Sequence, residues 1–462
     1  MKNLKYIVLL KPVSILLLLV VLVITTQCDS NINSNSIRVG VFKVNVTPPI
    51  GSPVAYTNTR SIVDSLYAKG IIILSDKNPI VLCAVDWIGI ANEGQDAWRE
   101  SLAKAAGTTI DRVSVHSIHQ HDGAECDFTT ARILEKYGLG GWRYDTLFSL
   151  KSIQSVAGAV KIAKQKAKPV SHIGFGEAKV EKVASSRRIL GEDGKVKIVR
   201  YSSTTDPAAI AAPEGVIDPW LKCVSFWNQD QPIAILNYYA THPLSHYGKG
   251  DVSSDFVGIA RESIEEELEV PNIYFTGAGG NIAAGKYNDG SHERRFVLAS
   301  RMEKAMKQAW ESTTKTEVLL SDVEWNNVEV LLPLGKHLVE EELIAQLSDE
   351  ELDPWEKYEA ATELAWFQRT MSGHKVNVSA LKIGNIRLLN IPGEAFVEYQ
   401  LAAQKMKPGD HICTAAYEEY GPEYICTEIA YTQGGYESSP SASLVAPEVE
   451  SVLLKAIGQV LK

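Results

Sequence analysis

Short apolar runs alternate with amphipathic stretches along most of the chain. Runs rich in β-branched residues predict strands at residues 70–75, 79–87 and 111–119, because such side chains fit a pleated, half-buried surface. Stretches with apolar residues every three or four positions predict helices. We expect these helices at residues 98–106, 147–167, 254–268 and 297–310.

Two later segments add a broken helix and a hairpin. Residues 339–371 have a helical pattern interrupted by Pro354, and proline removes a helical hydrogen bond, so we expect a break there. Residues 376–394 alternate on both sides of a Gly-Asn pair, which predicts a hairpin that runs into a loop. Strands and helices that alternate indicate an α/β layered fold. We find no linker or repeat and expect residues 38–462 to form a single domain.

The first residues have the pattern of an export signal. A basic start leads into an apolar run at residues 12–26, about the length of a signal-peptide core. Cys28 follows and opens a polar spacer, residues 28–37. We expect residues 1–27 to be a lipoprotein-type signal peptide, with a lipidated Cys28 anchoring the protein to a bacterial membrane in the cell envelope. Plain secretion and a retained apolar anchor are the alternatives.

Charge and cysteine content narrow the function. The formal net charge is −10, and the expected signal peptide contains three lysines and no acid. An acidic exported protein is a poor ligand for nucleic acid, so we expect no nucleic-acid partner. No C-x-x-C pair is present, which argues against a zinc ribbon. Either Cys413 and Cys426 form a disulfide, or the cysteines after Cys28 are buried apolar residues.

Histidines gather in VHSIHQHDGAECD, residues 115–127. This segment holds His116, His119 and His121, although the whole chain has only 10 histidines. If the preceding strand continues, His119 and His121 point to one face and His116 to the other. Neutral imidazole is a common zinc ligand, so His119 and His121 are candidates for one site. We expect a structural role for His116; for the other two, a structural role is the alternative, because a single His-x-His is a weak signal.

Two further segments place titratable residues at the ends of predicted strands, where α/β sheets commonly carry their sites. ILNYYATHPLSHYGKG has His242 at a strand end and His246 four residues on, and LLNIPGEAF has Glu394 after a Pro-Gly turn. Two imidazoles and a carboxylate are a frequent catalytic zinc set. The segment GAGGN, residues 277–281, lacks the pattern of a phosphate-binding loop, and we expect a tight turn that lines the pocket.

Six segments, in order, resemble the catalytic domain of the neutral (non-lysosomal) ceramidases. They are VGVFKVNVTPPIG, VHSIHQHDG, NYYATHPLS, VSSDFVGIA, NIPGE and EYICTEIAYTQGGYE. Together they extend over most of residues 38–445, and their order makes the resemblance specific for the superfamily. The resemblance implies an α/β fold of layered mixed sheets with flanking helices, and a zinc-dependent hydrolase.

The resemblance also implies roles for individual residues. The ligands of one divalent metal ion, expected to be Zn²⁺, would be His119, His242, Glu394 and Tyr424. His121 would lie beside the scissile bond without binding the metal, and Arg187 and Tyr436 would contact the reacting group, with Arg188 as the alternative to Arg187. Substrate-binding positions would be Gly51, His246 and Asn281.

Two features depart from the family pattern. The serine that the family uses for amide cleavage corresponds to Ala283, so no hydroxyl is present at that position. The chain ends at Lys462 after a predicted helix, and we expect no C-terminal immunoglobulin-like domain. We therefore expect an exported hydrolase that cleaves an amide or ester bond with a metal-activated water. Its substrate would be a small molecule or glycoconjugate other than ceramide. Glycoside cleavage and non-catalytic metal binding are the alternatives.

Overall fold

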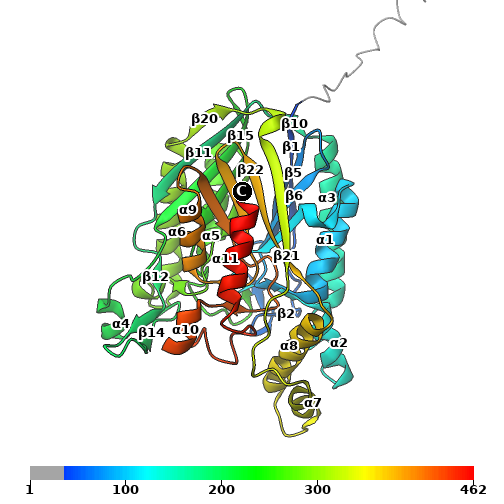
Figure 1. The fold of residues 1–462 in the computed structure, drawn as a ribbon, viewed down its shortest axis with the longest axis vertical. Coiled ribbons are helices and arrows are strands. Elements are labelled where there is room, and N and C mark those ends of the chain that lie inside the picture. The colour runs from blue at the N-terminus through cyan, green and yellow to red at the C-terminus, as the bar shows by residue number, and fades with distance from the viewer. Residues whose placement is uncertain (1–35) are drawn as a thin grey trace, which may run out of the picture. The chain divides into compact units, whose positions relative to one another are not determined.

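Three sheets form the centre of residues 36–462, the part of the chain that the computed structural model describes (Figure 1). The first has the order β10 (Lys168–Pro169), β1 (Arg38–Asn45), β5 (Tyr67–Leu74), β6 (Ile80–Val85) and β8 (Val113–Ser117). The second has the order β18 (Asn272–Thr276), β16 (Gln231–Tyr239), β15 (Trp220–Asn228), β11 (His172–Lys179) and β20 (Thr314–Glu317). The third has the order β21 (Val323–Val330), β22 (Val376–Ile383), β23 (Ile386–Asn390) and β25 (His411–Ala415).

Helices cover the outer faces of these sheets. The first sheet packs against α1 (Asn92–Ala106) and α3 (Thr146–Gln165), and the second against α5 (Asp255–Leu268) and α6 (His292–Glu311). The third packs against α9 (Val397–Met406) and α11 (Val449–Val460) (Figure 1). The remaining helices are α2 (Phe128–Lys136), α4 (Pro207–Ala211), α7 (Glu340–Ser348), α8 (Pro354–Met371) and α10 (Glu428–Gln433).

Short strand pairs connect the loops at the sheet ends. They are β2 (Pro53–Val54) with β3 (Thr57–Asn58), β4 (Ser61–Ile62) with β17 (Asp251–Val252), β7 (Gly89–Ile90) with β9 (Glu125–Cys126), β12 (Ser185–Ser186) with β19 (Ile282–Ala283), β13 (Arg188–Leu190) with β14 (Val196–Val199), and β24 (Glu394–Ala395) with β26 (Tyr424–Ile425). In Figure 1 the labelled members β2, β12 and β14 lie at the end of the molecule away from β10 and β20.

The continuous apolar strands are explained by burial on both faces. Along β6, Leu82 and Ala84 join a core that is shared by all three sheets, whereas Val81 and Cys83 join the core beneath α1 and α3. Strands buried on both faces lack the alternation of a half-exposed strand. Each sheet contains one parallel pair among antiparallel ones, namely β6 with β8, β16 with β18, and β23 with β25. The predicted α/β fold of mixed sheets with flanking helices is confirmed.

Several local predictions are confirmed as well. The predicted break near Pro354 falls between α7 and α8, where the Asp353 side chain caps α8 by accepting hydrogen bonds from the Trp355 and Glu356 amides. The predicted hairpin is β22–β23, with Gly384 at a positive φ of 60° in its turn. Cys83, Cys126, Cys223, Cys413 and Cys426 are all free and buried, so the Cys413–Cys426 disulfide alternative is wrong.

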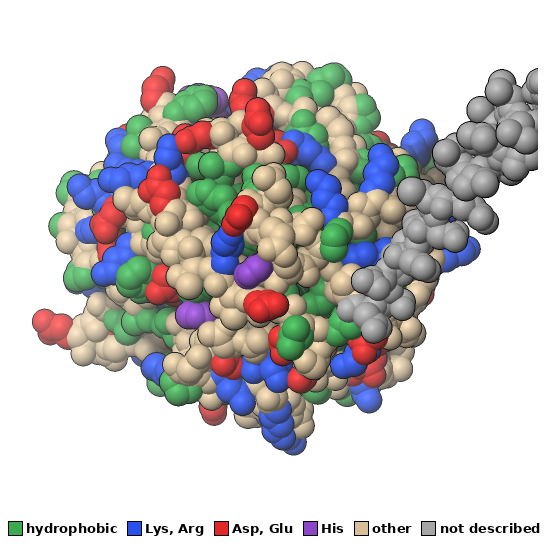
Figure 2. Space-filling view, turned by 90° about the horizontal axis from the view of Figure 1, so that it is seen from above, with side chains coloured by type: hydrophobic (Ala, Val, Ile, Leu, Met, Phe, Trp, Pro, Cys, Tyr) green, Lys and Arg blue, Asp and Glu red, His purple; other side chains and the backbone are tan. Residues whose placement is uncertain are grey.

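The exterior gives two further observations. No helix within residues 36–462 is both long and apolar enough to cross a bilayer. Seen from above, the molecule has acidic and basic side chains interspersed across the face (Figure 2). The expected signal peptide, with the lipidated Cys28, lies outside the described residues.

Candidate metal centre

Four predicted ligand residues meet where strands of different sheets end. His119 follows β8 of the first sheet, and His242 follows β16 of the second. Glu394 begins β24, and the parallel pairing of β24 with β26 places it directly opposite Tyr424. Because the carboxyl ends of these strands converge, residues far apart in the sequence come together at one point.

The imidazoles of His119 and His242 face each other through their Nε2 atoms. These atoms are 3.1 Å apart. His119 Nδ1 lies 2.6 Å from the Ile88 carbonyl and His242 Nδ1 lies 2.9 Å from the Gly279 carbonyl. A carbonyl oxygen can only accept, so each Nδ1 donates and each Nε2 is left to the site. Such second contacts are what fix the tautomer of a metal-bound histidine.

Glu394 completes this donor set. Its Oε2 lies 3.0 Å from His242 Nε2 and 3.3 Å from His119 Nε2, and it has no hydrogen-bond partner among residues 36–462. Burial raises the pKa of the Glu394 carboxyl, but the neighbouring histidines lower it more, so the net pKa is well below its usual range. Two imidazole nitrogens and an unpaired carboxylate oxygen that converge in a buried site fit a divalent cation, and N and O donors of this kind suit zinc.

His119 has an unusual backbone, which corrects one expectation. The strand does not continue to His121, because β8 ends at Ser117 and His119 has a φ of 71°. A left-handed conformation in a residue other than glycine costs about 1–3 kcal/mol and is concentrated at functional sites. The His119 amide donates to the Trp87 carbonyl, and its ring stacks on Tyr417 at 4.6 Å between centroids. These contacts hold the strained residue in place.

His121 lies beside the other two histidines, through this loop rather than through a strand. Its Nε2 is 3.2 Å from His119 Nε2, and its Nδ1 is in hydrogen-bonding contact with the Tyr56 hydroxyl. Burial, and then the proximity of His119 and His242, hold the pKa of His121 well below its usual range. The three histidines together could hold a metal ion. The separate role predicted for His121 therefore stays a prediction.

Tyr424 is linked to Arg187, and the geometry distinguishes the two adjacent arginines. The Tyr424 hydroxyl lies 3.4 Å from His242 Nε2 and accepts a hydrogen bond of 2.8 Å from Arg187 Nη1. Arg187 Nε is also paired with Glu437 at 3.0 Å. Arg188 instead donates to Glu437 and to the Gly434 carbonyl, away from the histidines. Arg187 is the arginine that adjoins the candidate site.

The remaining predicted residues lie at varying distances from the histidines. The ring of Tyr436 is 5.8 Å from that of Tyr424, and Arg187 lies over it at 5.6 Å. The ring of His246 packs against His292 at 4.0 Å and its Nδ1 contacts the Gly290 carbonyl, so it does not join the cluster. The Asn281 side chain binds Glu398 and the Val397 amide, which ties the turn to the segment after Glu394.

The turn at residues 277–281 packs tightly against the ligand-bearing loops. A Cβ at Gly279 would approach the His242 backbone nitrogen to 3.3 Å, and a Cβ at Gly280 would clash with the Glu394 carbonyl. Both glycines are thus required by close approach of backbones. The predicted tight turn is confirmed, and it fixes the relative position of His242 and Glu394.

Several residues that orient the cluster were not predictable from the sequence. Tyr420 donates a hydrogen bond of 2.9 Å to Glu394 Oε1, and Tyr56 contacts His121. The carbonyls of Ile88 and Gly279 carry no sequence signal, because any residue supplies a carbonyl. Only Glu437 could have been noticed in the sequence, because it is an acidic residue directly after the candidate site residue Tyr436.

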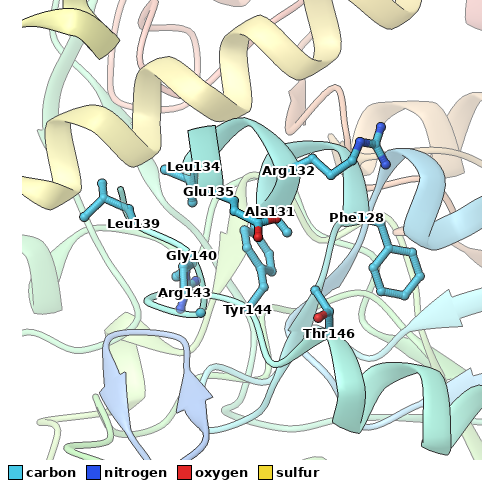
Figure 3. Close-up of a pocket in the computed structure, with 11 residues that line it drawn as sticks. Phe128, Ala131, Arg132, Leu134, Glu135, Leu139, Gly140, Arg143, Tyr144 and Thr146 are labelled. Carbon is cyan, nitrogen blue, oxygen red and sulfur yellow. The ribbon is translucent and has the colours of Figure 1, made fainter. Parts of the chain in front are cut away.

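Two cavities lie on either side of the segment that contains Gly141 and Arg143. One, of about 330 Å³, has Tyr56 and Gly51 in its lining, and Tyr56 in turn contacts His121. The other, of about 440 Å³, is lined by residues of α2 and by Tyr144 and Thr146 (Figure 3). The lining of this second cavity contains none of the predicted ligand residues.

Solved structures share this arrangement of sheets. No protein-family model matches the chain, and neither does any curated protein sequence. A ceramidase complexed with C2 matches with a TM-score of 0.66 and 15% identity over 92% of this chain and 74% of its own. The neutral ceramidase from Pseudomonas aeruginosa matches with a TM-score of 0.66 and 17% identity over 92% of this chain and 73% of its own. The chain has the neutral ceramidase fold. The resemblance seen in six short segments is thereby confirmed at the level of fold, and in this chain the loops that follow β8 and β16 carry the three clustered histidines.

Proposed function

We propose that this protein with a neutral ceramidase fold is a zinc-dependent hydrolase that cleaves an amide or ester bond. One observation carries the proposal. The Nε2 atoms of His119 and His242 and the Glu394 carboxylate converge within 3.3 Å of one another, and their other atoms are held by hydrogen bonds. Such a set is a preorganised cation site, and three protein ligands leave a position for water.

When bound, a divalent ion supplies a Lewis acid and lowers the pKa of a water to about 7. The chain's own residues would then position and move protons. His121 has its Nε2 beside the ligand nitrogens and its Nδ1 on the Tyr56 hydroxyl. This neutral imidazole can take up a proton from the attacking water and deliver it to the leaving group.

Arg187 is suited to stabilise charge on the reacting carbonyl. Its guanidinium is buried, held by Glu437, and shares a hydrogen bond with Tyr424, so it is preorganised beside the ligand cluster. A fixed donor pointing at developing negative charge is a large contribution to catalysis. Tyr436 lies on the open side of the same guanidinium and would contact the substrate.

Ala283 argues for water as nucleophile and against ceramide as substrate. It is fully buried in β19, and its backbone pairs with Ser185 of β12. The Ser185 hydroxyl donates to the Ala283 carbonyl, so it is engaged in the backbone pairing. A small molecule or a glycoconjugate is the substrate class that we propose. We also propose that the protein acts in the cell envelope, anchored through a lipidated Cys28, which loss of membrane association in a Cys28→Ala variant would test.

The proposed activity is tested with purified protein that is stripped of metal and reloaded with one equivalent of Zn²⁺. A panel of chromogenic amides, esters and glycosides should show hydrolysis of an amide or ester that requires the metal. Equal hydrolysis by stripped and reloaded protein would contradict metal dependence. Metal-dependent cleavage of glycosides alone would assign a different reaction to the site, and metal binding without any turnover would assign a binding role.

A further inference from the structure

Four tyrosines stand open to solvent around the candidate metal centre. Tyr56, Tyr201, Tyr247 and Tyr436 are each 40% to 45% exposed, although large aromatic side chains normally gain stability from burial. They come from four different segments of the chain. Single exposed aromatic residues are common, but several gathered around a buried polar cluster mark a surface that binds something.

The four rings, which we call the tyrosine rim, form two contacting pairs. Tyr56 contacts Tyr247 with ring centroids 5.9 Å apart, and Tyr201 contacts Tyr436 at 5.9 Å. Both pairs lie beside the ligand cluster, one next to His121 and the other next to Arg187. Inside the rim, Tyr56 stacks on His121 and Arg187 lies 5.5 Å from the ring of Tyr201. The rim therefore lies beside the ligand cluster and can contact a substrate that is bound there.

The cavity beside Tyr56 extends the rim with two tryptophans. Its volume of about 330 Å³ is within the range of small-molecule sites. Trp142 and Trp355 line it, with ring centroids 5.0 Å apart, together with Asn58 and the buried Arg143. Aromatic faces and polar groups thus continue from the metal centre into a recess large enough for one ring-shaped group.

We infer that the substrate carries a sugar ring, so that the scissile bond belongs to an N-acyl or O-acyl carbohydrate. A pyranose has apolar C–H faces and a border of hydroxyl groups. Tyrosine and tryptophan offer the matching surface, an apolar ring with a polar tip. An acyl chain would instead be matched by aliphatic side chains such as Leu190, Val216 and Ile429, which line a separate cavity beside Arg188. This inference rests on the proposed hydrolase activity, since it names the substrate class of that same site.

The substrate class is tested with three compounds that share one acetyl amide and differ in the amine. They are N-acetylglucosamine, an N-acetyl sphingoid base and an N-acetyl amino acid. Zinc-loaded protein should hydrolyse the sugar amide with a kcat/KM at least about tenfold above the other two, equivalent to about 1.4 kcal/mol. Preference for the sphingoid base or the amino acid would overturn the inference while leaving the hydrolase proposal standing.

Rim variants test the tyrosines themselves. Tyr201→Ala and Tyr247→Ala should raise KM for the sugar amide about three- to tenfold with little change in kcat, because each removes one stacked ring. Tyr201→Phe keeps the ring and should stay within about twofold of the original KM. Ile162→Ala, which removes an exposed apolar side chain from α3, is the matched control and should change nothing. An unchanged KM in both alanine variants would contradict the role of the rim.

A binding measurement separates the two proposals. Calorimetry with chitobiose should detect binding to the zinc-loaded protein, and Tyr201→Ala should weaken it. If chitobiose binds in this way but no amide or ester is hydrolysed, the hydrolase proposal fails and carbohydrate recognition stands. If amides are hydrolysed but chitobiose does not bind, carbohydrate recognition fails and the hydrolase proposal stands.

Discussion

His119 and His242 present their Nε2 atoms to each other at 3.1 Å, and the Glu394 carboxylate lies within 3.3 Å of both. In each ring Nδ1 donates to a backbone carbonyl, that of Ile88 for His119 and that of Gly279 for His242, which leaves Nε2 to the site. Two imidazole nitrogens and a carboxylate oxygen this close together are donors that a divalent cation can share. The donor set of this chain with a neutral ceramidase fold could therefore hold a metal ion.

The first prediction concerns metal stoichiometry. Purified protein should bind one Zn²⁺ per chain, and His242→Ala should lose most of it without unfolding, as measured by elemental analysis and circular dichroism. His246→Ala is the matched control, because His246 packs against His292 outside the cluster, and it should keep its metal. Wild-type metal content in His242→Ala would contradict the ligand assignment.

The second prediction separates the two histidines of SIHQH. His119→Ala should lose metal and activity together. His121→Ala should keep the metal and lose about 10²–10⁴-fold in kcat, the usual range for general acid–base assistance. Tyr56→Phe removes the hydroxyl that contacts His121 Nδ1 and should cause a smaller loss in kcat. Metal loss in His121→Ala would instead make His121 a ligand, which its position 3.2 Å from His119 Nε2 permits.

The third prediction uses the adjacent arginines. Arg187→Lys should keep its zinc and lower kcat about 10²–10³-fold, because a flexible ammonium replaces a fixed donor beside the reacting carbonyl. Arg188→Lys should instead lower the midpoint of thermal unfolding with kcat nearly unchanged, since Arg188 joins Glu437 to the Gly434 carbonyl. The assignment fails if the two variants show the reverse pattern.

The fourth prediction concerns ceramide. Ala283 is buried and offers no hydroxyl, so release of fatty acid from ceramide should be slower than hydrolysis of the best substrate by at least about 10²-fold, roughly 2.7 kcal/mol in transition-state binding. Mass spectrometry of the released acid measures this rate. Ceramide turnover equal to that of the best substrate would contradict this prediction. It would mean that water can be the nucleophile for ceramide in this fold without the serine.

The fifth prediction is a pH dependence of stability. His116 lies in the core with its Nε2 accepting from the Thr276 amide and its Nδ1 donating to the Ala416 carbonyl, which confirms its expected structural role. Burial lowers the pKa of His116 to about 3. Between that value and about 6.5, the unfolded chain holds the extra proton, so stability falls as the pH falls, by about 1.4 kcal/mol per pH unit.

A His116→Gln variant isolates this effect, because glutamine can still donate and accept but does not titrate. Urea unfolding at pH 7 and pH 5 should show that the wild type loses about 2 kcal/mol more than the variant between these values. Equal losses in both proteins would mean that His116 does not contribute to the acid sensitivity.

The sequence by itself determined the elements and most of the candidate ligands. Apolar runs and helical periodicity depend on near neighbours, so the strands, the helix break at Pro354 and the hairpin around Gly384 were predictable. His242 and Glu394 were predictable because titratable residues at the ends of apolar strands commonly belong to the sites of α/β sheets. The clustering of His119 with His121 was predictable because histidine is scarce elsewhere in the chain. The expected strand does not bring them together, however; a loop does.

Only the tertiary structure decided how these residues are held. Which carbonyl accepts each Nδ1 proton depends on which loops pack together, and a carbonyl leaves no trace in the sequence. Whether Arg187 or Arg188 contacts Tyr424 depends on the direction in which each side chain points between β12 and β13. The left-handed backbone of His119 is tolerated because Trp87 and Tyr417 hold it. Local pattern reports the propensity of a segment, whereas the protonation state, strain and exposure of a side chain are set by distant segments that pack around it.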